Sequence, residues 1–394
     1  MISQPRFLLD VRAQTEGWGA GRIPNQGNRS HAIRSLSLPQ FYTQHKEPEL
    51  LEQGRSPDTI ATYRLHVARW LEWQQKYRIS NPVLPISAIF ATDLRDWRSW
   101  LLAHEIASTN RSANKHVGSI QSILATAGEH DAHDSPPRIK PLEHQAAAQK
   151  SYLTYDQVNA LYQACDVAQW PAVDRHGQSL PHSAPTYWRA FIVLQFNYGQ
   201  RTEELWSYGR HQRTLTWRQV SWEAETPAPE GSAQNDAGWF FYVPQKQRRK
   251  KPAPLVLPLN RTTAEHLRSI MPPGELDLDG RIFPAPFSRD SFYATWRAIV
   301  AASGARLKQD LETGDRPPLN IKIFRKSCET WHDKHSRGDG RAGIGEIITG
   351  HAERSVSGKH YANRERRLVE AVERFPQPSA FAQIHHAQQM RLFR

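Results

Sequence analysis

The sequence predicts a two-domain chain, with an all-α domain first and a larger mixed α+β domain after it. Apolar residues recur at helical spacing from residue 36 to 130, which indicates a small helical bundle. Residues 131–150 contain three prolines, mixed charge and no apolar period, and this composition predicts a linker. Strand-like runs occur only beyond this linker, so we expect a small antiparallel sheet in the second domain.

The first domain is expected to follow a flexible basic arm, residues 1–35, which is rich in Gly, Arg, Asn and Gln and shows no periodicity. An ordered strap on the next domain is the alternative for this arm. Ser56 is the expected N-cap of a helix that has Pro57 at its first position. Thr92 and Asp93 are expected to open the next helix.

The second domain is predicted to cover residues 151–375 and to begin with a capping box between Thr154 and Gln157. An apolar helix is expected over Trp188–Tyr198, where Gly199 stops it. Residues 376–394 are the expected C-terminal tail. Docking of this tail on a neighbouring protomer and packing within its own chain are both open.

Three runs of the second domain are expected to form the sheet. These are Thr214–Trp222, Trp239–Gln245 and Leu255–Leu259. The last two flank the basic turn Lys246–Lys251, and together they predict a β-hairpin. Pro252 and Pro254 cannot donate to a ladder, so the third run is expected to be an edge strand.

The balance of charge indicates a polyanionic partner. The 394 residues include 51 Lys and Arg against 39 Asp and Glu, which gives a net charge of +12. A basic chain of this kind most often binds nucleic acid. The apolar run at Ala190–Leu194 is far shorter than the ~20 residues of a membrane span, and from the first residues, MISQPRFLLD, we expect no secretory signal. With only Cys165 and Cys328 as cysteines, a reducing cytoplasm is expected.

Separated segments of the second domain supply the groups for metal-free phosphate chemistry. Arg201 and Arg325 can each fork onto oxygens of one phosphate. His351 can bind the same phosphate or accept a proton, and the Tyr361 hydroxyl can attack phosphorus. A lysine at the hairpin tip can protonate a leaving alkoxide. Because fixed cations stabilise the charged transition state, neither a metal nor another cofactor is predicted.

The order of these segments resembles the motifs of the tyrosine recombinase (phage integrase) family. That family carries Gly-x-Arg-x-x-Glu-Leu, a hairpin lysine, His/Lys-x-x-Arg, Gly-His, and a tyrosine about ten residues later. The matching residues are Gly199, Arg201, Glu204 and Leu205, then Lys322 and Arg325, then Gly350 and His351, and finally Tyr361. The helical segment 36–130 is similar to the SAM-like core-binding domain of the family.

The resemblance implies a site-specific DNA recombinase or integrase of a mobile genetic element. Tyr361 is then the nucleophile, which forms a 3′-phosphotyrosyl bond and releases a 5′-hydroxyl. Arg201, Arg325 and His351 are implied to bind the scissile phosphate. Glu204 resembles the buried acidic residue that orients the site, with a solvated helix carboxylate as the alternative. Double-stranded DNA is the implied partner, bound by a homotetramer on two DNA sites.

The assignment of the lysines is less direct. Lys322 stands where the family often has histidine; it keeps a donor and a positive charge but cannot accept a proton as imidazole does. For the hairpin general acid we favour Lys246, which ends a strand-like run, over Lys250, which has the spacing of shorter family hairpins. The residues expected to contact DNA elsewhere are Lys250, Lys326, Arg111 and Lys115.

Two other functions are alternatives. A type IB topoisomerase uses the same chemistry, and Lys322 favours it, whereas the segment 36–130 and the tail favour a recombinase. A noncatalytic DNA-binding protein on a recombinase scaffold is the second alternative, and the chemically competent residues argue against it. His332 and His335 lie three residues apart, but no His-Glu-x-x-His motif accompanies them, so we predict no metal site.

Overall fold

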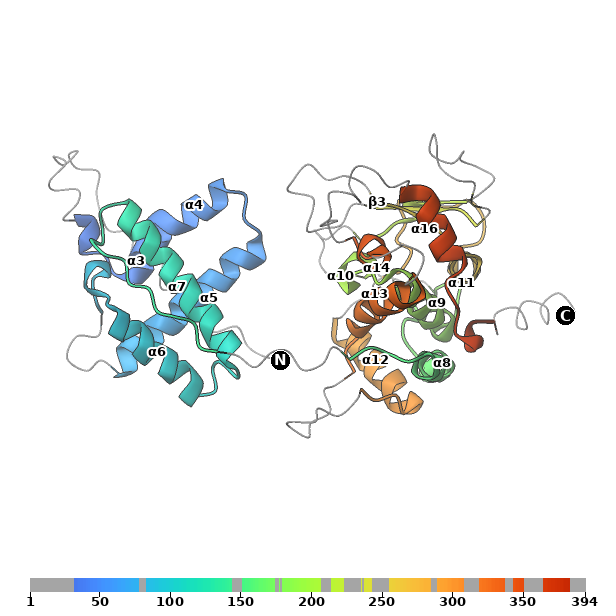
Figure 1. Cartoon of the computed structure of the whole chain (residues 1–394), viewed down its shortest axis with the longest axis horizontal. Helices are drawn as coiled ribbons and strands as arrows, with labels where there is room; N and C mark the ends of the chain where they lie inside the picture. Colours follow the sequence, from blue (N-terminus) through green and yellow to red (C-terminus); the bar gives the residue numbers. More distant parts are fainter. Residues whose placement is uncertain are drawn as a thin grey trace, which may run out of the picture. The chain divides into compact units, whose positions relative to one another are not determined.

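The computed structural model divides the chain into two compact units, Met1–Ala146 and Ala147–Arg394 (Figure 1). Each unit has a hydrophobic core of its own. The structure describes residues 32–77, 83–143, 151–173, 177, 179–206, 214–222, 235, 237–242, 255–284, 289–307, 319–336, 343–350 and 364–382. The predicted arm lies outside these residues up to residue 31.

Helices build the described part of the first unit. They are α3 (Leu38–Phe41), α4 (Glu47–Glu52), α5 (Pro57–Tyr77), α6 (Ala91–Ala103) and α7 (Asn110–Glu129). A π-helical turn, Tyr42–Lys46, joins α3 to α4, and a 3₁₀ turn, Ile86–Ala88, precedes α6. The core is aromatic: Trp70 of α5 and Trp97 of α6 are fully buried and meet edge to face, with ring centroids 5.1 Å apart.

Local capping explains where these helices begin. Ser56 caps α5 as predicted, because its Oγ accepts the N–H of Thr59 at 3.1 Å. Helix α6 begins at Ala91, before the predicted Thr92. Asp93 is the reason, since its carboxylate accepts the N–H of Phe90 at 2.7 Å from the third helical position.

Part of the predicted linker lies along the first unit. The amide of Asn114 on α7 donates to the carbonyl of Leu142 at 2.8 Å and accepts its N–H at 2.9 Å. The buried His133 ring donates from Nε2 to the carbonyl of Ile89 at 2.9 Å. Residues 131–143 therefore pack on the helices that precede them.

The second unit combines helices with one small sheet. Its helices are α8 (Tyr155–Gln163), α9 (Ala184–Tyr198), α10 (Thr202–Leu205), α11 (Arg261–Ile270), α12 (Arg289–Ser303), α13 (Ile323–Ser336), α14 (Ile344–Ile348) and α16 (Arg364–Glu373). The Thr154–Gln157 capping box that starts α8 is present as predicted. No helix in the described part of either unit is both long enough and apolar enough to cross a membrane.

The sheet is antiparallel throughout, with strand order β1 (Val220–Ser221), β2 (Trp239–Tyr242) and β3 (Leu255–Pro258). Strands β2 and β3 pair with Phe240 opposite Leu257, which confirms the predicted pairing of these two runs. Strand β3 lies at an edge of this sheet, as its flanking prolines predicted. The connection that carries Lys246 and Lys250 lies outside the described residues.

The first predicted strand, Thr214–Trp222, is wrong over most of its length. Residues Trp217–Gln219 form a 3₁₀ turn, and only Val220–Ser221 pairs with β2. The Gln219 side chain caps this turn by accepting the N–H of Thr216 at 2.8 Å, and Thr216 forms an isolated antiparallel bridge with Arg281 instead of pairing with β2.

Helix α9 is the centre of the second unit, with twelve of its fifteen residues buried. It begins at Ala184, four residues before the predicted Trp188, because Ser183 caps it and Pro185 suits a first turn. Helices α11 and α13 pack against it. The C-terminal end of α9 is therefore held in place by this packing. The predicted stop at Gly199 is confirmed, because Gly199 is a left-handed C-cap with φ 54° and ψ 34°.

The start of the predicted tail packs within its own unit. The ring of Phe381 is buried, with its centroid 5.8 Å from that of Phe196 on α9. The N–H of Ala380 donates to the side-chain oxygen of Asn159 on α8 at 2.9 Å. Residues 376–382 of the predicted tail therefore pack within their own chain. Residues 383–394 lie outside the described residues.

Candidate active site

Gly199 is the point at which three segments of the predicted site meet. A Cβ added there would lie 2.9 Å from Cβ of Cys328, 2.9 Å from Cγ2 of Thr349 and 3.1 Å from Cα of Arg325. The positive φ and this crowding both require glycine. The end of α9, the start of α13 and the end of α14 are thereby packed together, as their neighbouring ribbons in Figure 1 also show.

Arg201 is held by Glu204 through two contacts. The Glu204 carboxylate accepts the backbone N–H of Arg201 at 3.0 Å and its guanidinium Nη1 at 3.0 Å. The Glu204 side chain is only 3% exposed and that of Arg201 is 21% exposed. Glu204 is therefore a buried carboxylate rather than a solvated one. A buried ion pair of this kind fixes the direction of the guanidinium.

Arg325 lies in the first turn of α13, and its side chain is fastened to the backbone of the first motif. Its Nη1 donates to the carbonyl of Gly199 at 3.0 Å. Its Nε lies 3.9 Å from Oε1 of Glu329, one turn later on the same helix. The two predicted phosphate-binding arginines are therefore both connected to the backbone at Gly199, Arg325 by a hydrogen bond and Arg201 by its place two residues later in the chain.

The Gly-His motif directly follows Thr349, which also packs against Gly199. Thr349 is fully buried, and its hydroxyl donates to Oε1 of Glu329 at 2.8 Å. Gly350 adopts φ 73° and donates its N–H to the carbonyl of Ile347 at 2.9 Å, which ends α14. His351 follows directly in the chain, but it lies outside the described residues, as do Lys246, Lys250 and Tyr361.

The described lysines of the second motif are exposed. Lys322 precedes α13 and donates its backbone N–H to the side-chain oxygen of Asn320 at 3.0 Å. Lys326 lies one residue beyond Arg325. Both residues lie at the same end of α13 as Arg325, so three cationic residues gather at this end of the helix.

Comparison with known proteins identifies the fold. No protein-family model matches the chain, and no curated protein sequence matches it. A lambda integrase dimer bound to a COC′ core site is similar over 91% of this chain and 87% of that chain, with a TM-score of 0.53 and 15% identity. A dimer of lambda integrase residues 75–356 on a COC′ core site covers 81% and 96%, with a TM-score of 0.50 and 14% identity.

This chain has the tyrosine recombinase fold. Its mostly helical second unit with a three-stranded antiparallel sheet is the architecture expected from the sequence. Within the tyrosine recombinase fold, the structure brings together Arg201, Glu204, Arg325 and Thr349 around the end of α9. The predicted DNA contacts Arg111 and Lys115 belong to the first unit, exposed and four residues apart on α7.

Asn197 is a structural residue of this site that sequence analysis did not identify. Its backbone carbonyl accepts from Sγ of Cys328 at 3.3 Å and from Nε2 of His332 at 3.0 Å. Its side-chain oxygen accepts from Asn260 at 2.7 Å and from Gln377 at 2.8 Å. These partners lie between 63 and 180 residues away in the chain, so no local sequence pattern predicts that they meet at Asn197.

The histidines weighed as a metal pair have other roles. His332 is buried and stacks on Phe375 with ring centroids 3.8 Å apart, and burial lowers its pKa to about 4. His335 is near Tyr155, whose hydroxyl lies 3.3 Å from its Nε2. Within the described ranges, no group of three or more His, Cys, Asp or Glu side chains could hold a metal ion.

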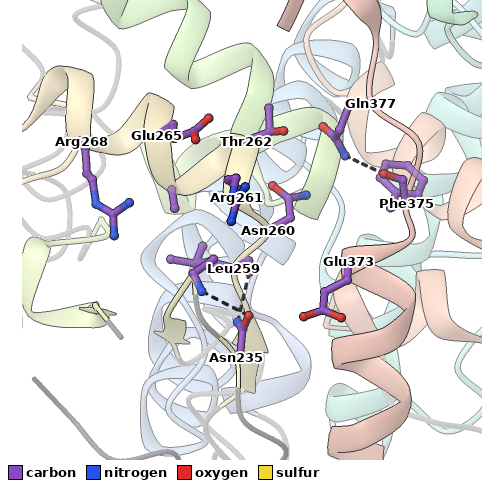
Figure 2. Close-up of a pocket in the computed structure, with 12 residues that line it drawn as sticks. Asn235, Leu259, Asn260, Arg261, Thr262, Glu265, Arg268, Glu373, Phe375 and Gln377 are labelled. Atoms are coloured by element: carbon purple, nitrogen blue, oxygen red, sulfur yellow. Dashed lines mark hydrogen bonds between the residues drawn. The ribbon is translucent and has the colours of Figure 1, made fainter. Parts of the chain in front are cut away.

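A cleft of about 580 Å³ lies between the start of α11 and the end of α16 (Figure 2). Figure 2 shows Arg261 and Glu265 on one wall and Glu373 on the other. Asn260 and Gln377 line it and also bond to the Asn197 side chain. Of the predicted site residues that the structure describes, none lines this cleft.

Proposed function

We propose that this chain is a site-specific DNA recombinase of the integrase type, which cuts and rejoins strands through a 3′-phosphotyrosyl intermediate. The observation that carries the proposal is the convergence of both arginine motifs on Gly199. Arg325 donates to its carbonyl, and Arg201 follows it by two residues and is held by the buried Glu204. Two oriented guanidiniums at one corner suit the non-bridging oxygens of one phosphate.

The proposed reaction is a transesterification. The Tyr361 hydroxyl oxygen attacks phosphorus while the bond from phosphorus to the 5′-oxygen breaks. The tyrosine proton passes to His351, and the departing 5′-oxygen takes a proton from Lys246, with Lys250 as the alternative donor. Lys322 adds positive charge beside the phosphate. Attack by another 5′-hydroxyl on the phosphotyrosine rejoins the strand, so the bond energy is conserved.

The proposed partner is double-stranded DNA. The lambda integrase structures with this fold hold dimers on core-site DNA, which supports the choice of partner. The first unit is proposed to be the SAM-like core-binding domain, with Arg111 and Lys115 of α7 on the phosphate backbone; Lys326 of α13 is proposed to contact flanking DNA. We further propose a homotetramer on two DNA sites, acting in the cytoplasm.

Covalent trapping tests this function. Nicked duplexes with a random central sequence are incubated with the full chain in EDTA, and complexes that resist detergent are recovered and sequenced. We expect adducts that share one sequence, and none from Tyr361→Phe, which should still bind DNA. An absence of adducts with the wild-type chain would contradict the proposal. Relaxation of supercoiled plasmid without any two-site exchange would instead identify a topoisomerase.

A further inference from the structure

Glu329 connects two motifs of the proposed site through one carboxylate oxygen. It lies on α13 four residues after Arg325. Its Oε1 accepts a hydrogen bond from Thr349 Oγ1 at 2.8 Å and lies 3.9 Å from Nε of Arg325. Thr349 immediately precedes Gly350 and His351. The Glu329 Oε1 atom therefore lies close both to Arg325 of the second arginine motif and to Thr349, which directly precedes the Gly-His motif.

The surrounding packing fixes this contact. A Cβ on Gly345 would lie 2.6 Å from the backbone oxygen of Glu329, so the backbones of α13 and α14 touch there. The methyl group of Thr349 lies against Gly199. The Thr349 hydroxyl also lies 2.9 Å from the carbonyl of Gly345. The carboxylate is the stronger acceptor of the two, because a hydrogen bond to a charged oxygen is stronger than one to a neutral carbonyl.

The negative charge of Glu329 decides between two roles for this residue, binding of DNA and orientation of Arg325. Its side chain is 27% exposed and that of Arg325 is 15% exposed, so both are partly shielded from water. A carboxylate this close to a phosphate site repels the DNA backbone and lowers affinity. Its contribution must then come from orientation, since Arg325 is held between the Gly199 carbonyl and Glu329.

We propose that Glu329 is a positioning residue, which holds the end of α14 at Thr349 and Gly350 in place beside the Arg325 guanidinium through its contacts with Thr349 and Arg325. This inference rests on the proposed function. It gives an unusual signature, in which loss of the carboxylate slows strand cleavage without weakening DNA binding. A residue that only stabilised the fold would not separate the two quantities.

The test measures single-turnover adduct formation and the Kd on the duplex recovered by covalent trapping. Glu329→Ala should slow cleavage about tenfold to hundredfold, the range for losing a hydrogen bond to a charged group, with an equal or lower Kd. Thr349→Val keeps the buried shape and should slow cleavage similarly. The double variant should be no slower than the slower single variant, because both substitutions remove the same contact between Glu329 and Thr349. Glu329→Gln keeps an acceptor for Thr349 and should recover part of the rate.

The matched control is Glu346→Gln, which removes a carboxylate from the neighbouring helix α14 and should leave both rate and Kd unchanged. Thermal unfolding of every variant is followed in parallel. Wild-type cleavage by Glu329→Ala, or rate losses that multiply in the double variant, would overturn the inference. A higher Kd that follows a lower Tm, without recovery by glutamine, would also overturn it. Failure of the wild-type chain to form any adduct would count against the proposed function instead.

Discussion

The guanidinium of Arg325 donates from Nη1 to the carbonyl oxygen of Gly199 at 3.0 Å. This bond joins the second arginine motif to the backbone that leads into the first. Because Gly199 also ends helix α9, the position of both motifs depends on a helix of which twelve of fifteen residues are buried. The site is thus built on a rigid element, which suits a reaction that needs exact phosphate geometry.

Gly199→Ala should damage both stability and the site. The left-handed conformation alone costs an alanine about 1–2 kcal/mol, and overpacking against Cys328 and Thr349 adds about 1–3 kcal/mol. Gly304→Ala is the matched control, since it has φ +64° and no atom within 4 Å of the added Cβ. Denaturant unfolding should show a loss about 1–3 kcal/mol larger for Gly199→Ala than for Gly304→Ala. Equal losses would mean that the crowding around Gly199 is unimportant.

The arginines should not tolerate lysine. Arg201→Lys and Arg325→Lys keep the charge but lose the planar fork, so we expect cleavage to fall about 10²–10³-fold, the scale for a preorganised donor. Single-turnover cleavage is the measurement, and DNA affinity should change far less. A lysine variant with a near-normal cleavage rate would show that the arginine has only a structural role.

The hairpin lysines can be separated by the leaving group. Lys246→Ala should cleave ordinary DNA slowly but a 5′-bridging phosphorothiolate almost normally, because sulfur leaves without a proton. Lys250→Ala should instead weaken binding and reduce the salt dependence by about 0.9 per lost phosphate contact. Rescue of Lys250→Ala by sulfur, and not of Lys246→Ala, would reverse the assignment.

Acid should loosen the second unit through His332. Its pKa falls from 6.5 in the unfolded chain to about 4 in the folded one, because the ring is buried. Between these values the unfolded state binds the extra proton, so stability falls as the pH drops, by about 1.4 kcal/mol per pH unit. His332→Gln should remove this one-proton slope.

Both cysteines of the chain are buried in the second unit, so thiol labelling between pH 7 and 5 reports the opening of that unit. The exposed His104→Gln is the control, and it should leave the slope unchanged. A slope that is no smaller in His332→Gln than in the wild-type chain would place this proton elsewhere.

Local signals in the sequence predicted much of the fold. The caps at Ser56 and Thr154 and the stop at Gly199 are side-chain or backbone preferences that act within a few residues. The hairpin of β2 and β3 followed from two apolar runs around one basic turn. The strand expected over Thr214–Trp222 is interrupted by the 3₁₀ turn Trp217–Gln219, which the Gln219 side chain caps at Thr216.

The candidate site could be predicted from the sequence only in part, because local signals do not show which distant residues the fold brings together. Residues proposed to carry the chemistry, such as Arg201 and Arg325, are conspicuous in the sequence by residue type and order. Residues that hold them, such as Asn197 and Glu329, act through partners that only the fold brings near. The contact between Glu329 and Thr349 spans 20 residues and two helices, and neither residue has a motif of its own.

The proposed attack of Tyr361 on the DNA phosphate is tested by identifying the residue to which the DNA is bound in the covalent adduct. The trapped adduct is digested with nuclease and protease, and the nucleotide-bearing peptide is sequenced by mass spectrometry. We expect a phosphodiester between the 3′ end of the DNA and the Tyr361 oxygen. A nucleotide on any other side chain would contradict it.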